Sequence, residues 1–462
     1  MKYVKYMCPG ILLGFVPLAC FLAASPAAAA EVNPQQPNIV FIMVDDMGYG
    51  DLSCYGQQTY QTPNVDRMAA EGIRFTEAYS GCTVCAPARS TLMTGHHMGH
   101  TSVRGNTGGI PLRDEDVTVA EVLGQAGYAV GGFGKWGLGD LETPGVPEQQ
   151  GFDRFFGYYH QIHAHDYFPE YLIDTGKKVP LEGEHAHYRI VAEMKTWITE
   201  HRAGPFFCYA AWTPPHARYQ FPQDDPFYAR VKDKPWPKNT KGHAAFNLMI
   251  DHHVGEVLEL LKELGIDKQT VVFFCSDNGA SLRNDGTLDS SGPLTGQKRS
   301  MHEGGLRVPQ IARWPGRIER DRVTDLPTYF PDVMPTLAEL AGAEKYLPVG
   351  IDGVSIVPEL TGRKQTSLRQ RTMYWEWPKY NWGKRKYTGL MQAVRRGNWK
   401  MLRHDADRPW ELYDLSQDIA EKNNLAEDRP EVVKRLDAWV DENRVPPREQ
   451  QEPESPPGRR FR

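Results

Sequence analysis

The chain has 462 residues, of which 40% are hydrophobic and 24% charged, and its formal net charge at pH 7 is −5. This composition excludes a disordered chain, a collagen and a coiled coil, and the length suffices for a large hydrophobic core. No basic excess is present to neutralise phosphates, so we expect no nucleic-acid partner. The seven cysteines are too few for a disulfide scaffold, and their odd number leaves at least one unpaired.

The first thirty residues are typical of a secretory signal peptide. Lys2 and Lys5 give a basic start, an apolar run follows at 11–22, and the small residues at 28–30 suit cleavage. We therefore expect an exported protein, periplasmic or secreted, whose mature chain begins after residue 30. Cleavage would remove two lysines and two cysteines, which leaves a net charge of −7 and five cysteines.

Two alternatives to a cleaved signal remain open at the N-terminus. The apolar run could stay as an uncleaved anchor, although Pro17 interrupts it and it is short for a bilayer span. A lipid could instead be attached at Cys20, which would make the protein a lipoprotein. No later segment approaches eighteen apolar residues, so we expect no membrane span in the mature chain.

Short apolar runs alternate with helical patterns over residues 36–345, which predicts an α/β fold with a mainly parallel sheet. The predicted buried strands are 38–44, 128–133, 205–211 and 270–275. The predicted helices are 63–71, 244–264 and 332–340.

The pattern changes near residue 350, where a smaller antiparallel α+β subdomain is expected to extend to residue 445. Residues 387–394 and 399–403 flank Arg396-Gly397-Asn398, which is a hairpin signal. A strand at 410–415 and a helix at 430–440 follow. The tail at 446–462 is rich in Pro, Gln, Glu and Arg, and we expect it to be disordered.

Polar residues follow all four predicted strands of the larger domain. They are Asp45-Asp46, Gly134-Lys135-Trp136, Thr213-Pro214-Pro215-His216 and Ser276-Asp277-Asn278-Gly279. One such group could be an ordinary turn or helix cap, because Asp and Asn are common turn residues. Active sites of open α/β sheets form beyond the carboxyl ends of the strands, so four groups at one edge favour a shared site.

The acidic groups at these strand ends suggest a metal ion. Asp45, Asp46, Asp277 and Asn278 supply three carboxylates and one amide oxygen. Crowding three carboxylates would raise their pKa values unless a counter-ion were present. An all-oxygen ligand set favours Ca²⁺ or Mg²⁺ over zinc or copper.

Residues 82–95 predict a helix that begins close to Cys85. Pro87 suits the first helical turn and Gly95 suits the end. The backbone amides and the dipole of a helix N-terminus would favour negative charge at Cys85. Cys82 and Cys85 also form a Cys-x-x-Cys pair, which could indicate a redox or zinc site. That alternative lacks a second cysteine pair and leaves the carboxylates unexplained.

These motifs together resemble the formylglycine-dependent sulfatases. The sequence Cys85-x-Pro87-x-Arg89, followed by Thr94-Gly95, is similar to the signature that directs oxidation of the cysteine. The resemblance extends over residues 36 to 445 and includes four further segments in family order: Asp45-Asp46, residues 127–136, Asp277-Asn278-Gly279 and residues 298–309. Residues 411–415 with 424–426 are typical of the family as well.

The resemblance implies an alkaline-phosphatase-like α/β/α sandwich around a large mixed, mainly parallel sheet, with the smaller C-terminal antiparallel subdomain. It implies a calcium ion and a maturation enzyme that converts Cys85 to formylglycine (3-oxoalanine), the nucleophile. The implied calcium ligands are Asp45, Asp46, Asp277, Asn278 and the modified Cys85. The other implied catalytic residues are Arg89, which holds the formylglycine, and Lys135, His216 and Lys298, which contact the sulfate.

One position departs from the family pattern. A histidine usually lies two residues after the lysine of Gly134-Lys135, where this chain has Gly137. Its absence leaves the base for sulfate release unidentified, so we predict slower turnover. The histidines that could replace it are His96, His97, His100, His160, His163 and His165. An unchanged rate of sulfate release in Gly137→His would contradict a missing base.

Two aromatic segments, 158–167 and 374–382, suit the binding of sugar rings, although ordinary packing would explain them too. The tentative substrate residues are Arg104, Asn106, His160, His163 and His165. We therefore expect a sulfatase acting on sulfated carbohydrates, with His216 as acid for the leaving oxygen. The alternatives are a phosphonate or phosphate ester hydrolase of the same superfamily and an unmodified, non-catalytic glycan-binding protein.

Overall fold

The computed structural model describes residues 1–2, 36–108, 110–281, 286–381, 384 and 386–447. All described residues from Gln36 onward belong to one compact unit, and the predicted boundary near residue 345 lies inside it. Most of the predicted signal peptide and nearly all of the predicted tail lie outside the described residues. In the part of the chain that is described, no helix combines the length and hydrophobicity needed to cross a membrane.

A ten-stranded mixed sheet forms the centre of the fold, in the order β11-β2-β10-β9-β1-β8-β4-β5-β6-β7. Its strands are β1 (Asn38–Asp45), β2 (Ile73–Phe75), β4 (Ala129–Lys135), β5 (Arg154–Tyr158), β6 (Tyr171–Asp174), β7 (Lys177–Pro180), β8 (Phe206–Pro215), β9 (Thr270–Ser276), β10 (Gln310–Arg313) and β11 (Arg322–Thr324). The five neighbours from β9 to β5 run parallel, whereas β10, β6 and β7 pair antiparallel with their neighbours. The predicted mixed, mainly parallel sheet is thereby confirmed.

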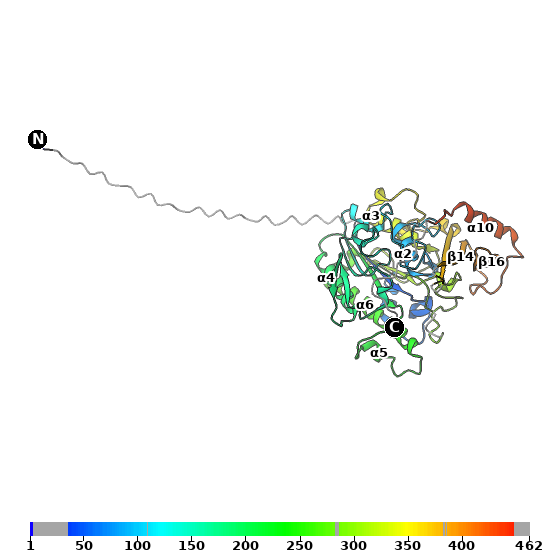
Figure 1. Cartoon of the computed structure of the whole chain (residues 1–462), viewed down its shortest axis with the longest axis horizontal. Coiled ribbons are helices and arrows are strands. Elements are labelled where there is room, and N and C mark those ends of the chain that lie inside the picture. Colours follow the sequence, from blue (N-terminus) through cyan, green and yellow to red (C-terminus); the bar gives the residue numbers. More distant parts are fainter. Residues whose placement is uncertain (3–35, 109, 282–285, 382–383, 385, 448–462) are drawn as a thin grey trace. The chain divides into compact units, whose positions relative to one another are not determined.

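Helices pack on both faces of this sheet. The helices of the described chain are α1 (Pro63–Ala70), α2 (Cys85–Thr94), α3 (Val119–Gln125), α4 (Ala186–Glu200), α5 (Pro226–Ala229), α6 (Lys238–Glu263), α7 (Glu303–Leu306), α8 (Val333–Ala341), α9 (Val357–Leu360) and α10 (Pro430–Glu442). On one side of the sheet lie α2, α3 and α8, and on the other α1, α4 and α6. Figure 1 shows α4 and α6 in green on the opposite side of the molecule from α10 in red.

The central strand β1 shows why the fold has three layers. Successive side chains of a strand point to opposite faces, and all eight residues of β1 are buried. Phe41 and its like-facing neighbours pack into a core that includes residues of α2, α3 and α8. Ile42 and its like-facing neighbours pack into a second core with α1, α4 and α6. A continuous apolar strand buried on both faces is the expected pattern for a parallel sheet between helices.

A four-stranded antiparallel sheet forms the C-terminal part. Its strands are β13 (Thr372–Asn381), β14 (Lys386–Arg396), β15 (Trp399–Arg403) and β16 (Glu411–Asp414), in that order. The predicted hairpin is present, because Arg396 pairs with Trp399 across Gly397, whose φ of 60° lies in the left-handed region. A further two-stranded sheet pairs β3 (Ala78–Tyr79) with β12 (Thr328–Tyr329).

Every predicted strand and helix is found, with shifted ends. β4 and β8 continue to Lys135 and Pro215, so both run directly into the predicted polar groups. The helix predicted at 244–264 begins six residues earlier, at Lys238, directly after Pro237. Pro237 lies at the N-cap, where proline is tolerated because the first N–H groups of a helix have no intrahelical acceptor.

Candidate active site

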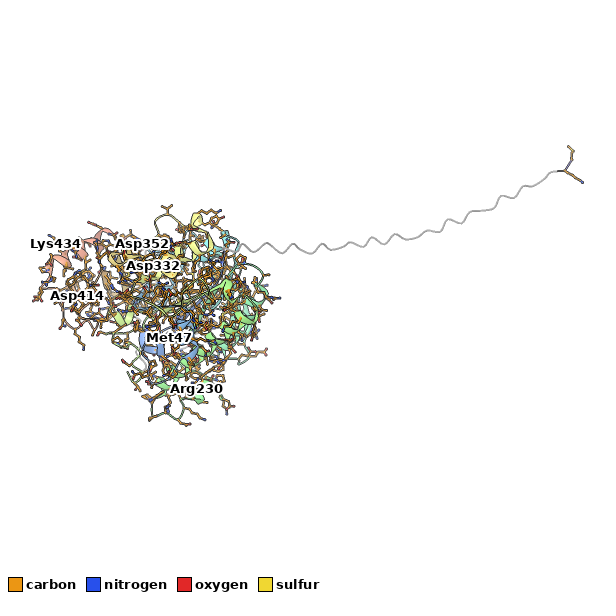
Figure 2. All side chains as sticks on the ribbon, turned by 180° about the vertical axis from the view of Figure 1, so that it is seen from behind. Met47, Arg230, Asp332, Asp352, Asp414 and Lys434 are labelled. Carbon is orange, nitrogen blue, oxygen red and sulfur yellow. The ribbon has the colours of Figure 1, made fainter. Side chains whose placement is uncertain are left out.

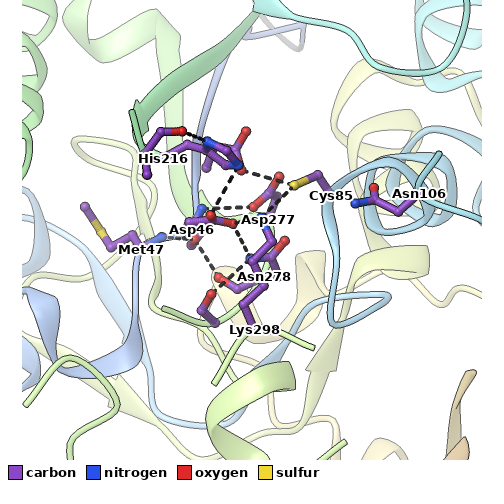
Figure 3. A network of polar contacts seen from close by, with 12 residues as sticks. Asp46, Met47, Cys85, Asn106, His216, Asp277, Asn278 and Lys298 are labelled. Atoms are coloured by element: carbon purple, nitrogen blue, oxygen red, sulfur yellow. Dashed lines mark hydrogen bonds and ion pairs between the residues drawn. The ribbon is translucent and has the colours of Figure 1, made fainter. Parts of the chain in front are cut away.

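The carboxyl ends of β9, β1, β8 and β4 meet at one edge of the sheet because these strands are parallel neighbours. Asp45 and Lys135 are the last residues of β1 and β4, while His216 and Asp277 follow β8 and β9 directly. We call the following set the strand-end cluster: Asp45, Asp46, Cys85, Arg89, Lys135, His216, Asp277, Asn278 and Lys298. Figure 3 shows six of its labelled members converging.

Buried lysines neutralise two of the carboxylates in the strand-end cluster. Lys135 Nζ lies 2.5 Å from Asp45 Oδ2, and both side chains are inaccessible to solvent. Lys298 Nζ donates to Asp46 Oδ1, and both groups are almost completely buried. Burial alone would raise the pKa of Asp45, but Lys135 and the other nearby cations hold it well below its usual value.

Arg89 holds the third carboxylate. Its Nη2 and Nε donate to Asp277 Oδ2 at 2.9 and 3.2 Å, and Nη1 donates to the carbonyl of Lys135 at 2.6 Å. Burial and the charge of Asp45 raise the pKa of Asp277 to about 6. Three carboxylates thus face three cationic side chains in a site closed to solvent.

Cys85 is the first residue of α2, as predicted, and Gly95 ends the helix with a φ of 69°. The Cys85 Sγ atom lies 3.2 Å from Asp45 Oδ1 and 3.3 Å from Lys298 Nζ. Burial, followed by the charge of Asp45, raises the pKa of the thiol to about 12. An unmodified Cys85 is therefore protonated at neutral pH and a poor nucleophile.

The Cys-x-x-Cys alternative finds no support in the structure. The Sγ atom of Cys82 donates to the carbonyl of Glu376 at 3.5 Å. The five cysteines among the described residues, namely Cys54, Cys82, Cys85, Cys208 and Cys275, are all free. The cluster around Cys85 consists of carboxylates and cations, which a thiol–disulfide site would not need.

The donor atoms of the cluster suit a hard divalent cation. Asn278 Nδ2 donates to Asp46 Oδ1 at 2.8 Å, while Asn278 Oδ1 is buried and finds no hydrogen-bond partner in the described part of the chain. A buried, unpaired amide oxygen beside carboxylates is the donor that Ca²⁺ prefers. A divalent ion would add positive charge to a balanced site, which would then favour an anionic substrate.

His216 and His165 form a stacked pair beside the carboxylates. Their rings are 4.2 Å apart and inclined by 13°. His216 Nε2 lies 3.5 Å from Asp46 Oδ2, and His216 Nδ1 contacts the carbonyl of Ala217. Burial lowers the pKa of His216 to about 4 and that of His165 well below its usual value. His165, one of the five residues proposed for substrate binding, therefore touches the strand-end cluster directly.

Two of the residues proposed to bind substrate hold the chain together. Asn106 Oδ1 accepts from the backbone amide of Ala86 at 3.0 Å and so caps the first turn of α2. Arg104 is buried, and it donates to Glu376 and to the carbonyls of Gly99, Thr101 and Val445. The guanidinium of Arg104 and the Oδ1 atom of Asn106 are thus engaged within the chain.

Three of the six histidines proposed as replacements for the missing base lie far from Cys85. His96, His97 and His100 follow the far end of α2, and a helix of ten residues is about 15 Å long. They cannot reach an atom attached to Cys85. His163 lies against Tyr158 and Tyr171. His160 accepts a hydrogen bond from the amide of Ile162.

Gly137, the position that departs from the family pattern, has a backbone conformation that suits glycine. Its φ of 78° lies in the left-handed region, which disfavours a side chain. A Cβ there would lie 3.6 Å from Gln161 Cβ and 3.7 Å from Gln161 Oε1. Gln161 is buried, its Nε2 donates to the carbonyl of Asn106, and its Oε1 has no partner among the described residues. No sequence signal singled out Gln161, because its approach depends on the path of the loop after β5.

Comparison with protein families relates these features to known proteins. The sulfatase family model matches residues 37–343, and a model described as "N-sulphoglucosamine sulphohydrolase, C-terminal" matches residues 296–445. Human arylsulfatase A is 33% identical over 90% of this chain and 89% of its own length. N-acetylgalactosamine-6-O-sulfatase of Bacteroides thetaiotaomicron is 28% identical over 87% of this chain and 92% of its own length.

Solved structures share the fold over nearly the whole chain. Ps i-CgsB in complex with k-i-k-neocarrahexaose superposes with a TM-score of 0.77 and 26% identity, covering 90% of this chain and 94% of that chain. A phosphonate monoester hydrolase of Agrobacterium radiobacter superposes with a TM-score of 0.66 and 21% identity, covering 88% of this chain and 94% of that chain. At that identity the second likeness concerns the fold alone.

Proposed function

Because this chain belongs to the sulfatase family and is a sulfuric ester hydrolase, we propose that it removes sulfate groups from sulfated carbohydrates at the strand-end cluster. The observation that carries the proposal is the convergence of Cys85 with three carboxylates and three cationic side chains in one buried site. Relatives named as N-acetylgalactosamine sulfatases, and a structural neighbour in complex with a neocarrahexaose, support a carbohydrate substrate.

We infer that Cys85 is converted to formylglycine before it acts. The motif Cys85-x-Pro87-x-Arg89, which resembles the signature for this oxidation, supports the conversion. In the metal-free chain burial raises the pKa of the thiol, so the unmodified side chain is protonated at neutral pH. A hydrated aldehyde offers one hydroxyl to attack sulfur and a second whose deprotonation releases sulfate. The maturation enzyme that this requires is part of the proposal.

We infer that calcium completes the site, held by Asp45, Asp46, Asp277 and Asn278 together with the modified Cys85. The unpaired Asn278 Oδ1 and the three carboxylates fit such an ion. When bound, it would supply Lewis-acid polarisation and positive charge at the nucleophile. Chelation of calcium is expected to abolish sulfate release, and added Ca²⁺ is expected to restore it. Full activity in the chelated protein would contradict a metal requirement.

The residues of the chain have distinct tasks in this proposal. Lys135 and Lys298 place positive charge where the sulfate oxygens gain negative charge during the reaction. Arg89 fixes Asp277 and the end of β4, which keeps Lys135 in place. His216 contacts the carbonyl of Ala217 through Nδ1 and presents Nε2 toward the cluster. Because the free ring is neutral at pH 7, His216 acts as acid for the leaving oxygen once Nε2 has taken up a proton.

The decisive experiment combines mass analysis with a substrate panel. The protein, produced together with a maturation enzyme, is digested, and the peptide that contains Cys85 is examined for aldehyde or thiol. Sulfate release is then measured on sulfated oligosaccharides, simple aryl sulfates and matched phosphate esters. An aldehyde and release from glycans, both lost in Cys85→Ala, support the proposal. A thiol with no turnover, or faster phosphate hydrolysis, would overturn it.

We also propose that the protein is exported, since residues 1–30 have the pattern of a signal peptide. Expression of the full chain followed by cell fractionation tests this. The mature protein is expected in the periplasm or medium with an N-terminus near residue 31. Retention of the uncleaved chain in the membrane fraction would instead indicate an anchor, and acylation at Cys20 would indicate a lipoprotein.

A further inference from the structure

A second group of metal-ligating side chains lies beyond the far end of α2. His100 Nδ1 lies 2.9 Å from both carboxylate oxygens of Asp352, and His96 Nδ1 lies 3.5 Å from Asp352 Oδ2. The two imidazole nitrogens and a carboxylate oxygen all lie within 4.8 Å of one another. Asp352 is labelled in Figure 2. The sulfate chemistry proposed above uses none of these three residues.

The backbone around this group holds Asp352 in place. The amide of His97 donates to Asp352 Oδ2 at 2.9 Å, and the amide of Asp352 donates to the carbonyl of Gly95 at 2.9 Å. His97 Nδ1 accepts from the amide of Gly99, so this atom is already engaged. Burial lowers the pKa of His97 to about 4, which leaves its ring neutral at pH 7.

One buried atom of the group makes no hydrogen bond within the described chain. His96 Nδ1 is buried, and it makes no hydrogen bond with any described residue. Its side chain as a whole is 29% exposed, as is that of His100, and Asp352 is 19% exposed. An ion from solvent can therefore reach the group, and water can complete its coordination.

We propose that His96, His100 and Asp352 bind a zinc-class divalent cation. Two imidazole nitrogens with one carboxylate are the donors that Zn²⁺ favours, whereas Ca²⁺ requires oxygen ligands. Zinc bonds of about 2.0–2.1 Å in a tetrahedron place neighbouring ligand atoms about 3.3 Å apart. The distances of 2.9 and 3.5 Å from Asp352 to the two histidines lie on either side of that value. The nitrogens of His96 and His100, which lie within 4.8 Å of each other, would have to come to about 3.3 Å.

The bound ion would join the end of the nucleophile helix α2 to the loop at residue 352. This link is separate from the strand-end cluster, because α2 places about 15 Å between them. The ion is thus expected to raise thermal stability without being required for the chemistry at Cys85.

The test measures zinc binding to the calcium-saturated protein after removal of transition metals. We expect one equivalent of Zn²⁺ to bind by calorimetry, and Zn²⁺ alone to raise Tm. His96→Gln removes one candidate ligand nitrogen and leaves the contacts of Asp352 with His100 and with the amide of His97 in place. His100→Gln removes a second ligand. Each is expected to weaken binding by about 100-fold or more and to abolish the Tm increase. His252→Gln, which changes an exposed histidine, is the matched control.

Three outcomes would overturn the zinc site. The first is no zinc binding in excess of calcium, and the second is equal binding by wild type and both variants. The third is binding that Ca²⁺ displaces competitively, which would place the zinc in the strand-end cluster. Calorimetry on folded His96→Gln, checked by circular dichroism, keeps the test independent of a folding defect and of the proposed sulfatase activity.

Discussion

At the scale of single residues, the strand-end cluster pairs each buried charge with a specific partner. Lys298 illustrates this, because its ammonium group contacts both Asp46 and Cys85. Removing the charged ammonium group from water costs free energy, which a close ion pair can offset. The pairing with Asp46 holds the lysine charged, since it raises the pKa of Lys298 against the effect of burial.

Lys298→Met is expected to lower kcat/KM for sulfate release by about 10²- to 10³-fold, because one charge facing the sulfate is lost. The rate is measured by release of inorganic sulfate from the best glycan of the panel. Lys177→Met, at an exposed position of β7, serves as the control and should leave the rate unchanged. A folded Lys298→Met enzyme with the wild-type rate would remove Lys298 from the proposed site.

Gly137 gives a second prediction at this scale. Gly137→Ala is expected to destabilise the protein by about 1–2 kcal/mol, because the left-handed conformation there disfavours a Cβ. Space is not the obstacle, since the nearest atom of Gln161 would be 3.6 Å from the added carbon. Urea unfolding measures the change, and Gly204→Ala, at an uncrowded position without a positive φ, is the control.

This backbone strain also changes how Gly137→His is to be interpreted. A histidine there would carry the same cost as alanine, so its effect on sulfate release should be compared with that of Gly137→Ala. A rate above that of the alanine variant supports a missing base. Equal rates would contradict it and would assign the deprotonation to a group already present in the chain.

The residues that follow strands could be predicted from their position in the sheet. Lys298 and His165, which lie outside the strands, were named from the family motif and from an aromatic segment, and Gln161 was not predicted. Asp45, Lys135, His216 and Asp277 were found because strand ends in a parallel sheet share an edge. His165 and Gln161 reach the site through the segment after β5, whose path depends on packing. Asn106 and Arg104 were predicted to bind substrate, although their contacts lie within the chain, because a polar side chain looks the same in sequence whether it caps a helix or faces a ligand.

At the scale of elements, β13 is a strand that the sequence did not predict. β13 is a ten-residue strand that was considered only as an aromatic segment, because it alternates weakly and contains Pro378. Its pairing with β14 along ten residues stabilises the extended conformation, which its own sequence favours only weakly. By contrast, β1 and β9 are continuous apolar runs, and such a run predicts a buried parallel strand from its own sequence alone.

The small sheet is joined to α7 by buried charges, and this link can be tested. Lys400 Nζ lies 2.8 Å from Glu303 and 2.9 Å from Glu421, with all three side chains inaccessible. Lys400→Met would leave two buried carboxylates without their shared cation, so we expect a loss of about 3–5 kcal/mol in unfolding free energy at pH 7. Urea unfolding measures it, and Lys422→Met at an exposed site is the control.

The pH dependence of this loss identifies its cause. Burial would raise the pKa of Glu303, but Lys400 and two arginines lower it to about 2. This stabilisation is present above the unfolded pKa of 4.5 and is lost as the pH falls toward 2. The difference between wild type and Lys400→Met should therefore shrink below pH 4.5. A difference that does not change with pH would point to lost packing and not to charge.

At the scale of the whole molecule, buried neutral histidines predict sensitivity to acid. Burial lowers the pKa of His185 to about 4 and that of His253 to about 3. Between the unfolded value of 6.5 and these values, only the unfolded chain binds the protons. The unfolding free energy should therefore fall by up to about 1.4 kcal/mol per pH unit for each histidine below pH 6.5.

Urea unfolding between pH 7.5 and 4.5 measures this slope. His185→Gln retains a donor for the carbonyl of Gln220 and should reduce the slope by about one proton. His252→Gln, at a half-exposed position, should leave it unchanged. Equal slopes in wild type and His185→Gln would show that other groups cause the acid sensitivity.

The wide spacing of the strand-end cluster along the chain has a consequence for how the protein forms. The contacts within it join residues separated by 40 to 252 positions, and β1 pairs with β8 and β9, which come far later in the chain. Such a high contact order makes folding slow. A nascent chain on the ribosome cannot assemble the cluster before Lys298 has been synthesised, so Cys85 spends the whole of that interval outside its final surroundings.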